Sequence, residues 1–432
     1  MSVAFLVLSA LTALSTFFAV ATPRRPVGLG FLSWMFGLLP SELPFASLAW
    51  SAILLAVFGA LGTFDTTLGI VALVLIGLAA LGQLVLARRS AAAGAVIEQA
   101  LQVALGPNYV DQIDPELKAQ FRDHVPLVPV LLKPFASRRR DVVRVKDLVY
   151  GDAGVRNRLD VYHHRSRPAN CPVLIYIHGG AWMYGKKDQQ GLPMIYHFAT
   201  HGWLCVAPNY RLSPAATFPD HLVDIKRVIA WVREHAAEYG GDPNQVFVSG
   251  GSAGGHLSAL AALTANHPAF QPGFETVDTS ITAAIPLYGD YDWLDSNAER
   301  STRGLVRTKY FVKHILKSAP DDNRALWEQG SPLLQVRAGA PPFFVLHGDR
   351  DTLLLVEDTR HFVAALRAVS SEPVAYAELP GAEHAFDLFQ SVRGGHVVNG
   401  VERFTAWVRS THVRSTQPAT VAQPVKLPVS HD

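Results

Sequence analysis

The sequence predicts an α/β fold in which an eight-stranded, mostly parallel sheet carries helices on both faces and follows an amino-terminal region of transmembrane helices. Two observations lead to this prediction. Nearly every residue from Met1 to Ala87 is apolar or small, whereas charged residues and Pro/Gly turns appear from about Val96 onward. From Val142, short β-rich runs alternate with helical patterns, which is typical of a parallel sheet covered on both sides. A chain of 432 residues has room for both regions.

Three apolar stretches in the first region have the composition of membrane-spanning helices. They are Val3–Ala21, Ala46–Leu61 and Leu68–Ala87. The third is long enough to cross about 30 Å of hydrocarbon as a helix, and the turn Thr63–Thr67 would join the second and third as a helical hairpin. The apolar segment Phe31–Leu39 is too short to span and ends at Pro40. It is therefore predicted to be an interfacial or partly buried helix.

The basic residues near these stretches predict the orientation in the membrane. Arg24 and Arg25 follow the first stretch, and Arg88 and Arg89 follow the third. Because basic residues favour the cytoplasmic side, we expect an outside amino terminus, three crossings and a cytoplasmic catalytic domain. The alternative is a signal peptide cleaved after Ala19-Val20-Ala21, which would leave the catalytic domain outside. The lack of a basic segment before the apolar stretch argues against it.

Eight runs rich in β-branched and aromatic residues predict the strands of the sheet. They are Val142–Tyr150, Arg158–His163, Val173–His178, Leu204–Pro208, Val246–Ser249, Ala283–Leu287, Phe343–His347 and Val374–Glu378. Between them, Leu222–Tyr239 and Val356–Ala368 carry apolar residues at helical spacing. This spacing predicts helices that pack on the sheet.

These patterns divide the chain into four parts. Residues 1–90 are the transmembrane helices, 91–141 a helical linker or cap segment, 142–412 the catalytic domain and 413–432 a flexible tail. Two stretches, Glu98–Phe135 and Tyr291–Ala340, fit poorly into the alternation of strands and helices. Both are candidates for cap elements over a site, the second as an insertion at about 290–340.

Composition excludes several kinds of partner. The formal net charge of +2 is spread over mixed signs, whereas nucleic-acid binding needs clustered Lys and Arg. The run Arg138–Arg140 is interpreted as a solvated segment that could touch anionic lipid headgroups. Cys171 and Cys205 lie in or beside apolar runs and are interpreted as core residues. No cluster has metal-ligand spacing and no glycine loop opens a phosphate site, so no cofactor is predicted.

The strongest chemical signal is VFVSGGSAGGH, where a predicted strand leads through a G-x-S-x-G turn into a predicted helix. A nucleophilic serine needs such a strained turn so that its Oγ projects from the sheet edge, and glycines on either side remove side chains that would clash. The helix amino terminus adds a positive dipole behind the developing oxyanion. Ser252 is the predicted nucleophile, and the N–H of Ala253 is a predicted oxyanion donor.

A second buried run, VLIYIHGGAW, ends in a loop that suits the same chemistry. Here the reaction needs backbone N–H groups instead of side chains. A loop at this place directs the amides of Gly179 and Gly180 at the substrate carbonyl oxygen, beside that of Ala253. His178 is interpreted as a structural residue that fixes the loop, and Trp182 as a pocket wall or core residue.

The acid and the base are expected on loops after the last two strands. The run FFVLHGDRDTLL offers Asp349 and Asp351. We choose Asp351, because one more turn of loop lets its carboxylate reach an imidazole, while Asp349 would support the loop. The run AELPGAEHAFDLF supplies His384 on a Pro/Gly loop, and the chain order Ser, Asp, His is typical of this arrangement. His396, which opens the predicted final helix, is the rival base.

These roles define a mechanism for ester hydrolysis. His384 accepts the proton of Ser252, Asp351 holds the imidazole in the required tautomer, and the three amides stabilise the oxyanion. Water then repeats the cycle on the acyl-enzyme. The predicted substrate is a small-molecule acyl ester or a lipid.

Taken together, the motifs resemble the hormone-sensitive-lipase-like carboxylesterases and related esterase/lipase families of the α/β-hydrolase superfamily. The resemblance covers Val142 to Arg409 and rests on HGGAW, PNYRLSPAATFP, GGSAGGH, HGDRDTL and GAEHAF. It implies an α/β-hydrolase fold with a nucleophile, an acid, a base and three oxyanion donors at Ser252, Asp351, His384, Gly179, Gly180 and Ala253. The amino-terminal region resembles that of some bacterial membrane-associated esterases, which implies a bacterial plasma membrane and lipid-derived substrates.

The sequence departs from that pattern at two positions. Gly251 stands where those relatives usually have Asp, and Ala181 where they usually have a third glycine. HGG-x-W also resembles kynurenine formamidases, so hydrolysis of N-formylkynurenine is an alternative function. A catalytically inactive hydrolase fold that serves as a membrane scaffold is a third hypothesis, against which the complete triad argues.

Overall fold

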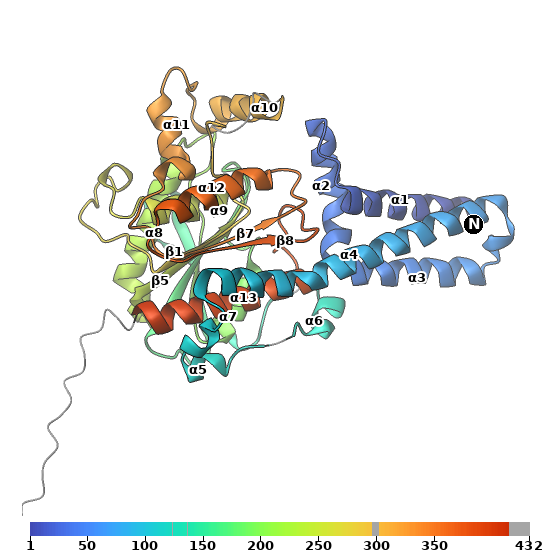
Figure 1. Cartoon of the computed structure of the whole chain (residues 1–432), viewed down its shortest axis with the longest axis horizontal. Helices are drawn as coiled ribbons and strands as arrows, with labels where there is room; N and C mark the ends of the chain where they lie inside the picture. Colours follow the sequence, from blue (N-terminus) through green and yellow to red (C-terminus); the bar gives the residue numbers. More distant parts are fainter. Residues whose placement is uncertain (123, 136, 296–301, 414–432) are drawn as a thin grey trace, which may run out of the picture.

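The computed structural model describes residues 1–122, 124–135, 137–295 and 302–413, so the predicted tail lies outside the described residues from residue 414 onward. Within these ranges eight strands form one sheet (Figure 1). They are β1 (Val142–Val149), β2 (Arg158–His164), β3 (Cys171–Ile177), β4 (Leu204–Pro208), β5 (Gly241–Gly251), β6 (Ala283–Leu287), β7 (Phe343–Gly348) and β8 (Val374–Leu379). Each predicted strand is present, and β4 and β6 have the predicted limits.

The strand order sets where the loops of the sheet meet. The order is β1-β2-β4-β3-β5-β6-β7-β8, in which β2 runs antiparallel to β1 and β4 while β3 to β8 run parallel to one another. The loops that follow β3, β5, β7 and β8 therefore leave from the same edge of the sheet. In open α/β sheets, ligands bind outside the carboxyl ends of the strands, so this edge is where a site is expected.

Helices cover both faces of the sheet (Figure 1). One face carries α8 (Asp220–His235), α9 (Ala253–Leu263) and α12 (Val356–Val369), and the other carries α7 (Leu192–Thr200), α13 (Val392–Val408) and the end of α4. In β3, Val173 and Ile175 belong to the first core, whereas Leu174 and Tyr176 belong to the second. Burial on both faces explains why this strand reads as a continuous apolar run.

The shorter helices lie at the margins of these layers. They are α5 (Pro115–Lys118), α6 (Leu127–Leu132), α10 (Thr302–Tyr310) and α11 (Arg324–Gly330). The two cysteines are buried and free, as the sequence predicts, with Cys171 in β3 and Cys205 in β4.

The amino-terminal region consists of α1 (Ser2–Ala21), α2 (Val27–Glu42), α3 (Pro44–Ala60) and α4 (Thr67–Leu105). Helices α1 and α4 are each long and apolar enough to cross a membrane, and α2 and α3, which meet at a bend of 87°, would together count as a third span. Phe5, Phe58 and Ile76 form a core between α1, α3 and α4. These three helices extend away from the sheet as one bundle (Figure 1).

Helix α4 is much longer than the apolar stretch that predicts it. It runs for 39 residues and packs on β8 and α13 with its second half. The domain boundary predicted at residue 90 therefore falls inside a continuous helix. The reason is that the sequence changes there from apolar on all sides to apolar on one side, and contains no proline that would end the helix. The residues buried against the catalytic domain are Ala93, Ile97, Leu101 and Leu105.

The structure also corrects the prediction that Glu98–Phe135 covers a site as a cap. Tyr109 and Ile113 of this segment belong to the core that α4 and α13 share. The segment thus packs on the face of the sheet opposite α8 and α9, away from the loops that follow the strands. The prediction failed because a helical, apolar segment can equally well cover a site or pack beneath α13, and the sequence pattern does not distinguish the two.

A buried ion pair attaches α2 to the catalytic domain. The guanidinium of Arg393 on α13 donates to the carboxylate of Glu42 at the end of α2, and both side chains are fully buried. Ser391 Oγ donates to the other oxygen of that carboxylate at 3.3 Å. Removing one partner of such a pair typically costs about 3–5 kcal/mol, because the remaining charge is left buried.

Candidate active site

The loop between β5 and α9 holds the predicted nucleophile in a strained conformation. Ser252 has φ 58° and ψ −121°, which non-glycine residues rarely adopt. The glycines around it allow a close approach of the neighbouring strand, since a Cβ at Gly250 or Gly254 would lie 2.4 or 2.0 Å from the carbonyl oxygen of Ile177. Helix α9 begins at the next residue, Ala253. This is the strand, turn and helix that the sequence predicts.

The predicted acid and base form a hydrogen-bonded pair. His384 Nδ1 lies 2.7 Å from Asp351 Oδ2, on the loops that follow β8 and β7. The other oxygen of Asp351 accepts hydrogen bonds from the N–H groups of Leu353 and Leu354, at 2.9 and 2.8 Å. Burial by itself would raise the pKa of Asp351, but the charges and hydrogen bonds of His384 and His347 lower that pKa well below its usual range. Asp351 is therefore held as a carboxylate.

The other candidates for acid and base lie elsewhere. Asp349 accepts a hydrogen bond from the N–H of Gly381 at 2.6 Å and so joins the two loops, as a supporting residue would. His396 lies on α13 against Gly94 of α4, so it faces away from the loops that follow β7 and β8.

The loop after β3 is strained over three consecutive residues. Gly180, Ala181 and Trp182 all have positive φ, at 113°, 52° and 59°. His178 supports this loop, because its buried ring lies 2.7 Å from the carbonyl oxygen of Gly179 and stacks on Tyr210. Burial lowers the pKa of His178 to about 4, so its ring is neutral at physiological pH.

The hydrogen bonds of this loop distinguish one predicted oxyanion donor from the others. The N–H of Gly179 donates to Gln190 Oε1 at 2.7 Å, so it is already used. Within the described part of the chain, the N–H groups of Gly180, Ala181 and Ala253 have no protein acceptor. Gln190 lies eleven residues further along the same loop between β3 and α7, and no motif in the sequence marks it as the acceptor.

Comparison with known proteins identifies the family. The BD-FAE family matches residues 159–366. The probable carboxylic ester hydrolase LipM of Mycobacterium tuberculosis is 39% identical over 415 residues, which are 96% of this chain and 95% of LipM. Esterase LipQ of the same organism is 42% identical over 316 residues, which are 72% of this chain and 73% of LipQ. The chain belongs to the carboxylic ester hydrolases of the α/β-hydrolase superfamily.

One solved structure supports the fold of this esterase. A truncated form of a carbohydrate esterase from gut microbiota matches with a TM-score of 0.53 over 61% of this chain and 96% of that chain, at 20% sequence identity. This likeness confirms the predicted fold class, and the relatives LipM and LipQ confirm the predicted enzyme class.

Ser252 and His384 open on a cavity of ≈660 Å³, a volume usual for small-molecule sites. Its walls are mostly apolar and are formed by residues from six parts of the chain, among them Val27, Phe31, Trp182, Tyr310, Phe311 and Leu353. The cavity of this esterase can hold an extended apolar group beside the serine.

The predicted cap insertion does contribute to this cavity. Val306 and Phe311 lie in its wall, together with Arg307 of α10. The guanidinium of Arg307 lies 3.5 Å from Asp290, 3.4 Å from Asp295 and 3.0 Å from Asp358. This network ties α10 to the loop after β6 and to α12, which holds the insertion over the site.

Sequence reasoning missed Glu383, the buried neighbour of the base. An oxygen of its carboxyl group accepts hydrogen bonds from the N–H groups of Thr352 and His384, at 2.7 and 2.9 Å, and so joins the acid loop to the base loop. Burial and the nearby carboxylate of Asp351 raise the pKa of Glu383 to about 8. The signal in the sequence is its place directly before the histidine, which is too weak to use alone.

This pKa predicts how stability depends on pH. Unfolded Glu383 loses its proton near the ordinary pKa of 4.5, whereas the folded protein keeps it to about pH 8. The folded state therefore binds more protons in this window, and its stability falls as pH rises from 4.5 to 8. We expect the Tm of the wild type relative to Glu383→Gln to fall between pH 5 and pH 8, as measured in detergent by thermal unfolding. A pH-independent difference would contradict this explanation.

Away from the site, one group of described residues has the donors of a metal site. His197 on α7 and His201, directly after the end of α7, approach Glu402 of α13, although the sequence suggested no such cluster. His197 Nε2 lies 3.1 Å from Glu402 Oε1, so these two donor atoms already satisfy each other. Burial lowers the pKa of His197, as in an ordinary core histidine.

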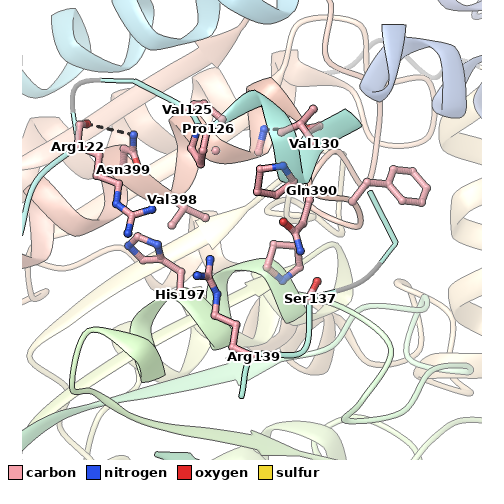
Figure 2. A pocket seen from close by; sticks show the side chains of 16 residues that line it. Arg122, Val125, Pro126, Val130, Ser137, Arg139, His197, Gln390, Val398 and Asn399 are labelled. Atoms are coloured by element: carbon pink, nitrogen blue, oxygen red, sulfur yellow. Dashed lines mark hydrogen bonds between the residues drawn. The ribbon is translucent and has the colours of Figure 1, made fainter. Parts of the chain in front are cut away.

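Beside this group lies a smaller cavity of ≈80 Å³. Figure 2 shows Arg122 and Arg139 on either side of His197, with Ser137 and Gln390 at the opposite wall. Burial and the charge of Arg122 lower the pKa of Arg139. None of the predicted catalytic residues lines this cavity, so it is separate from the ester site.

Proposed function

We propose that this esterase cleaves carboxylic esters with Ser252 as nucleophile, His384 as general base and acid, and Asp351 as the carboxylate that orients the base. The observation that supports this best is the 2.7 Å hydrogen bond between Asp351 and His384 beside a cavity that Ser252 also lines. The named relatives are ester hydrolases, which favours an ester over a formamide and an enzyme over a scaffold.

The proposed reaction has two halves. His384 Nε2 takes the proton of Ser252 Oγ as Oγ attacks the carbonyl carbon, while the Nδ1–H remains bonded to Asp351. His384 then gives this proton to the leaving alcohol as the ester C–O bond breaks, which leaves the acyl group on Ser252. A water molecule, deprotonated by His384, attacks this acyl-enzyme and releases the acid.

The oxyanion of each tetrahedral intermediate needs donors that are not already used. We assign them to the N–H groups of Gly180, Ala181 and Ala253, because the N–H of Gly179 is bonded to Gln190. Ala181 and Ser252 line the same cavity. The dipole of α9, which begins at Ala253, adds to the stabilisation of the negative charge.

The experiment that tests this function is hydrolysis of p-nitrophenyl esters of increasing acyl length by the full chain in detergent, beside its Ser252→Ala variant. Turnover that depends on Ser252 supports the proposal. Turnover that survives the substitution, or its absence on every ester, would overturn it.

The proposal extends to the membrane. Helices α1, α3 and α4 would cross it, while the basic residues Arg24, Arg25, Arg88 and Arg89 lie at the end of the bundle that carries the catalytic domain. Basic residues at this end favour a cytoplasmic catalytic domain and an outside amino terminus. A reporter enzyme fused after Asp432 should therefore be active only on the cytoplasmic side, and activity on the outer side would reverse the assignment.

A further inference from the structure

Helix α2 of the amino-terminal region forms part of the wall of the ester site. Val27 and Phe31 line the same cavity as Ser252 and His384. These residues lie more than two hundred positions from the serine in sequence, so their contact with the site is a property of the fold alone. Part of the predicted membrane region is therefore part of the ester site.

Hydrogen bonds fix α2 to both loops that carry the predicted acid and base. Trp34 Nε1 donates to the carbonyl oxygen of His384 at 3.2 Å. Thr352, next to Asp351, donates through its Oγ1 to the carbonyl oxygen of Gly30 at 2.9 Å. The wall is thus held at a fixed distance from the reacting groups.

The exposed side of α2 is suited to a membrane surface. Helices α2 and α3 meet at 87°, so if α3 crosses the bilayer along its normal, α2 lies in the plane of the interface. Figure 1 shows α2 lying across the axis of the bundle, at the end that faces the sheet. Its exposed large apolar residues are Phe31, Leu32, Met35, Phe36 and Leu39, which recur at helical spacing. An apolar stripe on a helix of this orientation is typical of interfacial helices.

The cap helix α10 lies at another part of the cavity wall. Val306 of α10 lines the cavity and is nevertheless half-exposed, and its neighbour Leu305 is exposed too. Exposed apolar residues that rim a ligand cavity mark a surface for an apolar partner. Both walls, α2 and α10, thus present apolar side chains at the surface.

We infer that α2 is the membrane-side wall of the pocket, and that this esterase takes a long-chain lipid ester from the bilayer between α2 and α10. The inference rests on the proposed function at Ser252. An acyl chain that enters from the interface would lie against Phe31 and the apolar acid loop, with its carbonyl carbon at Ser252 Oγ. The partner is the lipid bilayer, because α2 follows directly from the candidate span α1 and continues into α3, with which it forms the bent pair of apolar helices before the candidate span α4.

Two phenylalanines of α2 provide a matched test. Phe31 is 50% exposed and lines the cavity, whereas Phe36 is 43% exposed and does not. Full-length Phe31→Ala and Phe36→Ala would be reconstituted in phosphatidylcholine vesicles that contain a long-chain monoacylglycerol. The release of fatty acid from it would be compared with hydrolysis of water-soluble p-nitrophenyl acetate.

The expected result separates the two substrates. Phe31→Ala should lower turnover of the vesicle-borne ester about tenfold more than it lowers acetate hydrolysis, because the apolar contacts that are lost are contacts to the acyl chain. Phe36→Ala should leave both rates near those of the wild type. Equal losses on both substrates, or equal effects of the two variants, would overturn the inference. Acetate hydrolysis that still depends on Ser252 would then leave the proposed function intact.

Discussion

Replacing Ser252 by alanine is expected to lower kcat for ester hydrolysis by about a millionfold, because no acyl-enzyme can form without its Oγ. The site around it should survive. Ser252 is fixed by backbone geometry, its N–H donating to the carbonyl oxygen of Leu287 at 3.0 Å, and alanine retains that bond. The variant should therefore bind substrate without turning it over. The loss of kcat is measured by steady-state hydrolysis of p-nitrophenyl butyrate by the full-length protein in detergent.

Ser258 provides the control for this substitution. It lies on α9 six residues after the nucleophile, and its buried Oγ donates to the carbonyl oxygen of Gly254 at 2.7 Å. Ser258→Ala removes a hydroxyl from the same helix without touching the cavity, so kcat should stay within about threefold of the wild type. If both serine variants lost activity to the same extent, the loss would indicate damage to the loop between β5 and α9, and the assignment of Ser252 would fail.

The sequence predicts the sheet well because its central strands are buried on both faces. Such strands appear as apolar runs between turn residues, and their order along the chain gives the order of the loops. The candidate acid and base could be found for the same reason, since Asp351 and His384 each follow a strand directly. Their hydrogen bond, at 2.7 Å, follows from parallel strands that end at one edge.

What the sequence could not predict depends on contacts that no motif marks. The use of the Gly179 N–H by Gln190 is decided by one side chain eleven residues further along the same loop. The contact of Gly30 with Thr352 joins residues 322 positions apart, and no local pattern carries that information. The continuation of α4 past residue 90 was missed because a change from apolar to amphipathic character resembles a domain boundary even where the helix does not end.

Replacing Asp351 by asparagine is expected to lower kcat by about ten-thousandfold through the tautomer of His384, as in related triads. The new side chain would keep its oxygen on the N–H groups of Leu353 and Leu354. Its amide N–H would then point at His384 Nδ1, which must accept this hydrogen bond and therefore cannot carry the ring proton. The ring proton moves to Nε2, so His384 can no longer take the proton of Ser252.

Asp349→Asn, two residues away, is the control, because it alters a carboxylate that joins two loops. It should lower kcat by less than about tenfold. The measurement compares the steady-state kcat of Asp351→Asn with that of Asp349→Asn. Similar losses would mean that neither carboxylate orients the base.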